Sequence, residues 1–307
     1  TTEGISRSIE VFDRNSDLAE LGLSSVGYST RGAGLIYGVP FTEYDRVFFG
    51  LRWENTTIDL TPSSPIRYVE YVRQFGETSE TLAFTTGWSR DNRDNLLVPQ
   101  RGNYQRAFAE VGLPVLDLQY YRLSYQYQQF WPVFNRVTLA MNTEVGYGDG
   151  YSGDPYPFFK NFYVGGIGSV RGYEGGSLGP TDLFGNPLGG NRRFNASFEA
   201  LTPLPGADRT LRALAFLDMG QVWGQSVYCP DGSTPNFSAT ATAVCPTSGN
   251  PVYRNQKVDL GDLRYSIGIG IAWISPLGPL KLSYAYPLND KPTDRLQRFQ
   301  FQIGTGF

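Results

Sequence analysis

The amino-acid sequence predicts an all-β fold, an antiparallel transmembrane β-barrel with about 12 strands in this chain. Apolar and polar residues alternate along most segments, and short connections alternate with long ones. The composition agrees, since the 307 residues include 36 Gly, 20 Tyr and 20 Phe, yet the mean hydropathy is only −0.30. A chain that is polar on average and rich in aromatic residues suits strands with one face toward lipid and one toward a wet lumen.

The alternation is clearest in residues 264–275. Bulky apolar side chains occupy every second position: Tyr265, Ile267, Ile269, Ile271 and Trp273. Small or polar side chains occupy the positions between them: Ser266, Gly268, Gly270 and Ala272. Segments 45–59, 135–148 and 192–203 repeat the pattern, with their charged residues on the second face. This period of two places the apolar face against lipid and the polar face in the lumen.

Segments with this pattern are expected as strands at 5–12, 25–39, 45–59, 79–92, 102–114, 118–131, 135–148, 192–203, 209–223, 262–275, 279–287 and 296–307. The short connections carry turn sequences such as WPVFNR and TPLPGADR. Outer-membrane barrels have short turns on the periplasmic side and long loops outside. The long connections are therefore expected outside, and Phe307 is expected at the periplasmic rim.

Two long connections carry further signals. Residues 65–76 have apolar positions spaced for a short surface helix, with an irregular loop as the alternative. Residues 224–259 hold both cysteines of the chain, Cys229 and Cys245. In an outer loop of an oxidising compartment they are expected to form a disulfide worth about 3 kcal/mol in the chain-entropy model. Two free thiols are the alternative, and a metal site is disfavoured because the chain has no histidine.

The composition argues against enzymatic, metal-dependent and nucleic-acid-binding functions. Histidine, the residue that most often serves as general base and metal ligand, is missing from the sequence. The acidic turns at 13–17 and 91–95 lack the remaining positions of an EF-hand loop. The formal net charge is −3, so no basic surface for nucleic acid is expected. We expect no cofactor, no bound metal and no catalysis.

A glycine-rich stretch in the longest connection carries a family resemblance. The sequence VRGYEGGSLGP at 170–180 resembles the sixth-loop signature of the BamA family of outer-membrane assembly barrels. The wider superfamily also includes TamA barrels and two-partner secretion transporters. Further stretches resemble the family in the same order: ASFEALTPLP at 196–205, FLDMGQVW at 216–223, AWISPLGPLKLSYAYPL at 272–288 and FQFQIGTGF at 299–307.

The resemblance implies a domain organisation. Barrels of this family have sixteen strands and follow periplasmic POTRA domains. Residues 1–307 would then form one transmembrane barrel domain that corresponds to the last twelve strands, with the N-terminal strands and the POTRA domains outside this chain.

The resemblance also assigns a role to Arg171, the arginine in the glycine-rich stretch. In the family, this loop folds back into the lumen, and its arginine meets acidic residues on the twelfth and thirteenth strands. These positions correspond to Glu199 and Asp218, which the alternation places on the inner face. A guanidinium can bind carboxylates with two parallel hydrogen bonds, so it fixes direction as well as distance. We therefore expect Arg171 to position the loop.

The neighbours of Arg171 complete the expected loop-anchoring motif, which comprises Val170, Arg171, Gly172 and Tyr173. Glycine lets the backbone turn sharply and approach the barrel wall. The ring of Tyr173 can pack against the wall while its hydroxyl forms a hydrogen bond.

The last strand is expected to act as an edge. Its lipid-facing positions are Phe299, Phe301, Ile303, Thr305 and Phe307. Its inward positions are Gln300, Gln302, Gly304 and Gly306. Glycine loses much entropy on ordering and packs no side chain, so the end of this strand is expected to pair weakly. The aromatic terminus also resembles the signal with which barrel proteins enter their assembly pathway.

Together, these features indicate an outer-membrane protein assembly factor that inserts β-barrels without nucleotide. The expected partners are nascent outer-membrane proteins, the lipid bilayer and accessory lipoproteins of an assembly complex. The alternative is a polypeptide secretion pore of the two-partner type, because it shares the signature loop. A passive porin is disfavoured by the long loop, which would plug the lumen.

Overall fold

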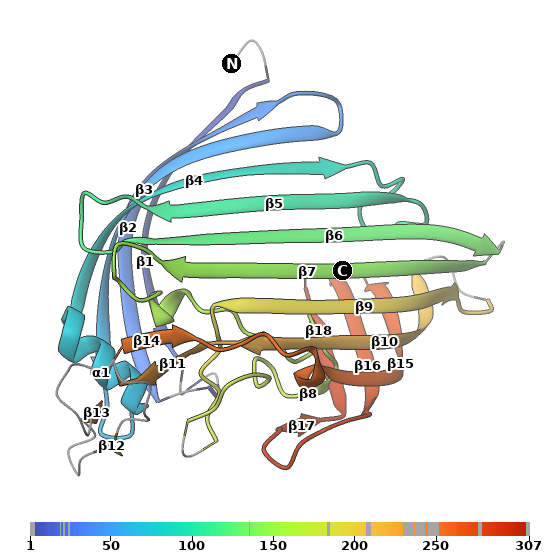
Figure 1. Ribbon diagram of the computed structural model, residues 1–307. Coiled ribbons are helices and arrows are strands. Elements are labelled where there is room, and N and C mark those ends of the chain that lie inside the picture. Colours follow the sequence, from blue (N-terminus) through green and yellow to red (C-terminus); the bar gives the residue numbers. More distant parts are fainter. Residues whose placement is uncertain are drawn as a thin grey trace.

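The computed structural model describes residues 4–18, 20, 22–23, 25–134, 136–182, 185–206, 210–229, 236–237, 243–244, 252–275 and 278–304. Its main feature is one curved, 12-stranded antiparallel sheet (Figure 1). The strands follow one another in the sheet in chain order, so every connection joins neighbours. The predicted all-β barrel fold is confirmed.

The strands of the sheet are β1 (Ser6–Asp17), β2 (Val26–Pro40), β3 (Asp45–Leu60), β4 (Thr78–Asp91), β5 (Gly102–Gly112), β6 (Tyr120–Phe134), β7 (Val137–Gly150), β9 (Arg192–Pro203), β10 (Leu211–Trp223), β15 (Arg264–Ser275), β16 (Gly278–Pro287) and β18 (Phe299–Ile303). Each overlaps one of the predicted segments, with bounds that differ by a few residues. The first strand reaches Asp17, well beyond its predicted end, because β1 pairs with β2 along its whole length.

The predicted last strand is divided in the structure. Residues Leu296–Gln297 form β17, which leaves the main sheet and pairs with β8 (Gly172–Tyr173). The chain then joins the sheet as β18, which pairs with β16 from Phe299 to Ile303. A contact with a distant loop therefore overrides the local alternation at 296–297.

The two faces of the sheet differ as the alternation predicts. On β15, Ile267 and Ile269 point outward and are 50% and 66% exposed, whereas Ser266 points inward and is buried. The same holds on β18, where Phe301 is exposed and Gln300 is buried. The outward face is apolar enough to contact lipid, and the inward face carries the polar and charged side chains.

Smaller elements lie in the connections. They are α1 (Ile66–Phe75), the 3-10 turns η1 (Phe158–Lys160) and η2 (Leu260–Asp262), and the short strand pairs of β11 (Gln225–Tyr228) with β14 (Val252–Asn255) and β12 (Asn236–Phe237) with β13 (Ala243–Val244). The predicted helix at 65–76 is confirmed. Within the part of the chain that the structure describes, no helix has the length and apolar character needed to cross a membrane.

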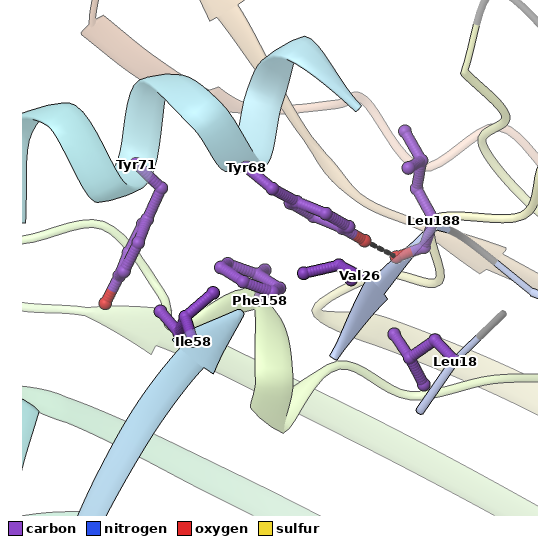
Figure 2. Close-up of a cluster of buried hydrophobic side chains, with 7 residues drawn as sticks. All are labelled: Leu18, Val26, Ile58, Tyr68, Tyr71, Phe158 and Leu188. Atoms are coloured by element: carbon purple, nitrogen blue, oxygen red, sulfur yellow. Dashed lines mark hydrogen bonds between the residues drawn. The ribbon is translucent and has the colours of Figure 1, made fainter. Parts of the chain in front are cut away.

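Helix α1 packs against the long connection between β7 and β9, as Figure 2 shows. Phe158 lies between the rings of Tyr68 and Tyr71, with ring centroids 3.9 and 5.3 Å away. The Tyr68 hydroxyl donates a hydrogen bond to the carbonyl oxygen of Leu188 at 2.9 Å. The helix therefore buries its aromatic face and holds this connection against the ends of β2 and β3.

The sheet ends at β1 on one side and β18 on the other. Among the described residues, neither strand has a main-sheet partner on its outer side. Within the described residues, β1 and β18 are therefore the first and last strands of the sheet.

Candidate functional site

The connection between β7 and β9, residues 151–191, is called the luminal loop here. Its described residues fold back on themselves through isolated bridges between Phe162 and Gly190 and between Val164 and Leu178. The loop then meets the inner wall at two ionic clusters, because its charged side chains contact inward-facing residues of the strands. The first cluster contains the predicted Arg171.

Arg171 binds Asp218 of β10 through both side chain and backbone. Its Nε and Nη2 atoms donate hydrogen bonds of 2.7 Å to the two carboxylate oxygens. Its backbone N–H donates a third, 3.0 Å long, to Oδ2. Ser197 Oγ of β9 accepts from Arg171 Nη2 and donates to Asp218 Oδ1. Since Arg171 is 2% exposed and Asp218 is fully buried, solvent does not compete for these bonds.

Glu199 of β9 is the second acidic partner. Its Oε1 forms an ion pair with Arg171 Nη1 at 2.7 Å. Lys281 Nζ of β16 donates to the same oxygen at 2.9 Å. The Arg171 guanidinium also lies 3.4 Å above the centre of the Phe216 ring. The structure therefore brings Arg171, Glu199 and Asp218 together, as the sequence analysis expects.

The partners of Arg171 stabilise its charged form. Burial alone would lower the pKa of the Arg171 guanidinium, but the hydrogen bonds that it donates to Asp218 and the charges of Glu199 and Asp218 raise it above its usual value. A permanently charged group is thus held among two carboxylates, an arrangement that fixes position and has no titratable proton to transfer.

Gly172 lets the backbone reach the wall. Its φ is +92°, in the left-handed region, and a Cβ at this position would lie only 3.1 Å from Ala285 Cβ. Glycine therefore serves two needs here, the backbone conformation and the close approach to β16.

Tyr173 and Val170 pack on either side of this turn. The buried Tyr173 donates from its hydroxyl to the carbonyl oxygen of Tyr265 at 3.3 Å. Its own carbonyl oxygen accepts a 2.6 Å hydrogen bond from Gln300 of β18. Val170 is fully buried in a cluster with Val164 and other apolar residues of the loop and β10. All the residues of the expected motif thus touch the wall, and one of them contacts the last strand.

A second ionic cluster ties the luminal loop to the opposite part of the sheet. Lys160 Nζ lies 2.7 Å from Glu54 of β3 and 3.1 Å from Glu110 of β5. The Tyr120 hydroxyl donates to Glu110 at 2.6 Å, and Arg52 lies 3.5 Å from Glu54. Burial alone would lower the pKa of Lys160, but Glu110 and Glu54 help to raise it well above its usual value.

This second cluster could not be predicted from the sequence. The alternation places Glu54 on the inner face, but no pattern in the stretch PYPFFK at 155–160 shows that Lys160 reaches it. Ser197 and Lys281 were missed for the same reason, because the contacts depend on how a distant loop folds.

The connection between β16 and β18 reaches across the same end of the sheet. Arg295 donates to the carbonyl oxygens of Gly22, at 2.5 Å, and Gly185, at 3.2 Å. It also donates to Asn186 Oδ1 at 2.9 Å. Connections that are far apart in the sequence therefore close over the lumen together.

The expected terminal edge strand is present in part. Phe299, Phe301 and Ile303 point outward and are 60–65% exposed. Gly304 has a φ of +104°, and its N–H donates to the carbonyl oxygen of Pro279 at 2.9 Å. The other two edge positions of the prediction, Gly306 and Phe307, lie outside the described residues.

Only one of the two cysteines of the predicted disulfide lies within the described residues. Cys229, at the end of the β11 segment, is buried and disulfide-bonded. Its predicted partner, Cys245, lies outside the described residues.

A β-barrel wall with a lipid-facing outer surface, crossed by a long loop that is anchored on the inner wall, defines an outer-membrane barrel with an occluded lumen. The Omp85 superfamily domain matches residues 1–307, and the chain belongs to that superfamily. It is an integral protein of the outer membrane.

Two kinds of relative support this assignment. The chain is 41% identical to the outer membrane protein assembly factor BamA of Neisseria meningitidis serogroup B, over all of this chain and 40% of that relative. The chain thus spans about two fifths of the length of that protein.

The structure of BamA from Haemophilus ducreyi lacking POTRA domains 1–3 superposes with a TM-score of 0.82 at 24% identity, over 98% of this chain and 59% of the other. CdiB from Acinetobacter baumannii superposes with a TM-score of 0.51 at 14% identity, over 97% of this chain and 45% of the other. These two structural likenesses concern the fold.

Proposed function

We propose that the protein containing this chain assembles other β-barrel proteins into the outer membrane, without nucleotide and without catalysing a chemical reaction. The 41% identity to an outer membrane protein assembly factor motivates the proposal. The proposed partners are nascent outer-membrane proteins and the bilayer, with accessory lipoproteins in a larger complex. The observation that carries the proposal is this identity together with the match of residues 1–307 to the Omp85 superfamily domain.

The proposed mechanism uses the edge of β18, where the backbone has no main-sheet partner among the described residues. Gly304 N–H bonds to Pro279 of β16, and the carbonyl oxygen of Arg298 accepts from Ala285 of the same strand. In an antiparallel ladder, residues of the same parity bond to the same neighbour. The N–H and C=O groups of Phe299, Phe301 and Ile303 therefore point to the open side. Such an edge can template a strand of another protein by β-augmentation.

The second part of the proposed mechanism concerns the bilayer near this edge. The outward residues of β18 within the described part of the chain run from Phe299 to Ile303, and Thr305 and Phe307 continue the alternation in the sequence. The proposal is that the apolar belt here is narrower than a hydrocarbon core of about 30 Å, which favours local thinning of the bilayer. Thinning lowers the barrier for a new strand to enter beside the edge.

A secretion pore of the two-partner type remains the alternative, since it would use the same fold. Sequence identity favours assembly over secretion, because the chain is 41% identical to BamA of Neisseria meningitidis and 14% identical to CdiB from Acinetobacter baumannii. The two functions predict different fates for a client protein, and reconstitution separates them.

The test uses the full-length protein in liposomes, with an unfolded barrel client added outside. Assembly predicts that the client gains the compact, heat-sensitive gel mobility of a folded barrel faster than in empty liposomes. Secretion predicts an unfolded client that becomes protease-protected in the liposome interior, and this outcome would overturn the proposal.

Two matched variants test the edge itself. Phe301→Pro removes an N–H that points to the open side, so client assembly should fall while the heat-modifiability of the protein itself is retained. Phe301→Leu keeps the N–H and should assemble clients at nearly the normal rate. Equal activity of the two variants would contradict the edge mechanism.

A further inference from the structure

The lipid-facing wall carries a groove that the assembly function does not use. It has a volume of about 730 Å³ and crosses the outer surface from β4 to β10. Its floor contains the small side chains of Ala107, Ala109 and Thr86, and its sides include Leu123, Val145 and Phe194. The register of the strands places all of these residues on the outward face. The groove is therefore apolar and opens toward the membrane.

The dimensions of the groove fit one leaflet. From β4 to β10 there are five steps between neighbouring strands, or about 24 Å at the usual strand spacing. Because barrel strands tilt by about 45°, a row perpendicular to them descends about 17 Å through the membrane, close to half of a hydrocarbon core of about 30 Å. Trp223, the last residue of β10, marks the outer end, and Thr86 lies deep in β4.

Two buried N–H donors lie at the outer end of the groove. Trp223 is 5% exposed, and its Nε1 has no hydrogen-bond partner among the described residues. Arg192 Nε is equally buried and also lacks a partner within that part of the chain. Both residues line the groove. Buried donors are nearly always satisfied in proteins, so a pair of unmet donors points to a ligand with acceptor oxygens.

The remaining surroundings of Arg192 leave room for an anion. Its Nη1 donates to the carbonyl oxygen of Gln256 at 3.2 Å, and its guanidinium lies 5.1 Å from the centre of the Tyr147 ring. Asp149, the nearby acidic residue, accepts hydrogen bonds from Asn255 and Gln225. Its charge is thus partly satisfied by amides, while the positive charge of Arg192 has no carboxylate partner among the ion pairs that the described residues form.

We propose that this groove is a binding site for a phosphorylated glycolipid of the outer leaflet, with one acyl chain along Ala107 and Ala109 and a phosphate at Arg192 and Trp223. An acyl chain matches the apolar floor, and phosphate oxygens match the two N–H donors. The extracellular position of the donors selects a lipid of the outer leaflet. The site would hold a lipid against the outer wall at β5 to β10, away from the open edge of β18.

The test measures lipid retention by the full-length protein in detergent, without any client protein. The protein is exchanged into micelles with lipid A, phosphatidylglycerol or phosphatidylcholine at equal mole fraction, and bound lipid is counted by native mass spectrometry. One lipid A is expected to remain per protein after the other two lipids have been washed away. Because no assembly step is involved, this result is independent of the proposed function.

Variants locate the bound lipid. Ala109→Trp fills the floor of the groove and should lower lipid A retention about tenfold, as should Arg192→Gln through loss of a charged hydrogen bond. Ala215→Trp is the matched control, because Ala215 also points to lipid on β10 but lies outside the groove. Its retention should equal that of the unaltered protein, and the gel mobility of each variant reports folding.

Three outcomes would overturn the proposal. Retention of the three lipids to the same extent would mean ordinary annular lipid. Preference for phosphatidylglycerol would mean a different lipid from the one proposed. Unchanged retention in a folded Ala109→Trp variant would place the lipid elsewhere on the wall.

Discussion

Replacing Lys160 with methionine removes the cation that ties the luminal loop to β3 and β5. The change leaves Glu54 and Glu110 buried, with side chains only 6% and 5% exposed. Breaking a buried ion pair from one side costs about 3–5 kcal/mol. Arg52 still lies 3.5 Å from Glu54, and Tyr120 still donates to Glu110, so we expect the low end, about 3 kcal/mol.

This cost should appear as local release of the loop. About 3 kcal/mol corresponds to a population of released loop that is about 100-fold larger. Limited proteolysis of the protein in detergent, with cleavage sites assigned by mass spectrometry, measures that population. Cleavage within residues 151–191 should therefore be about 100-fold faster in Lys160→Met when the loop opens and closes faster than it is cut.

Two controls define the result. Lys291→Met breaks the exposed pair with Asp262, whose side chains are 51% and 42% exposed, and should change cleavage little because such pairs contribute about 0–1 kcal/mol. Combining Lys160→Met with Glu54→Gln and Glu110→Gln removes the unpaired charges and should restore most of the protection. A cleavage rate for Lys160→Met that matches the Lys291→Met control would refute the reasoning.

Three further predictions concern the first cluster and the cysteines. Arg171→Lys keeps the charge but loses the paired hydrogen bonds to Asp218, so cleavage of the luminal loop should rise about tenfold in the same assay; no change would mean that charge alone holds the loop. Gly172→Ala should destabilise the loop by about 1–2 kcal/mol, because alanine resists a positive φ, and a melting curve identical to that of the unaltered protein would count against it. Cys229 and Cys245 should resist alkylation without reductant, and non-reducing mass spectrometry should give a mass two hydrogens below the dithiol.

The strands could be predicted from the sequence because the alternation of apolar and polar residues depends only on local surroundings. Each strand contacts lipid on one face and the wet lumen on the other, so every second residue reports its own surroundings. The residues around Ile269 show this directly. The short helix was predictable for a similar reason, since apolar spacing within 65–76 suffices. Its packing against Phe158 was not, because that partner lies far away in the chain.

The arginine cluster was predictable only in part. Alternation places Glu199 and Asp218 on the inner face, and a family resemblance was needed to bring Arg171 to them. Ser197 and Lys281 share that face, but many polar residues do. Only the folded path of the luminal loop selects which of them become partners, and that path depends on contacts between distant residues.

The two anchor points of the luminal loop have a mechanical consequence. Lys160 holds the first part of the loop to β3 and β5, while Arg171 holds its middle to β9 and β10. The loop therefore links two distant parts of the curved sheet, and it fixes the curvature of the strands that lie between them. β18 lies outside this span and is attached to the loop by the hydrogen bond that Gln300 donates to the carbonyl oxygen of Tyr173. The hairpin of β1 and β2 is joined to β3 by the backbone ladder and by the pair of Arg52 with Glu10. Its outer end is also held by Arg295, through Gly22, and by the apolar cluster around Val26. Flexing of the sheet should therefore concentrate in the part of this hairpin farthest from that end, while the strands between the two anchor points keep a constant curvature.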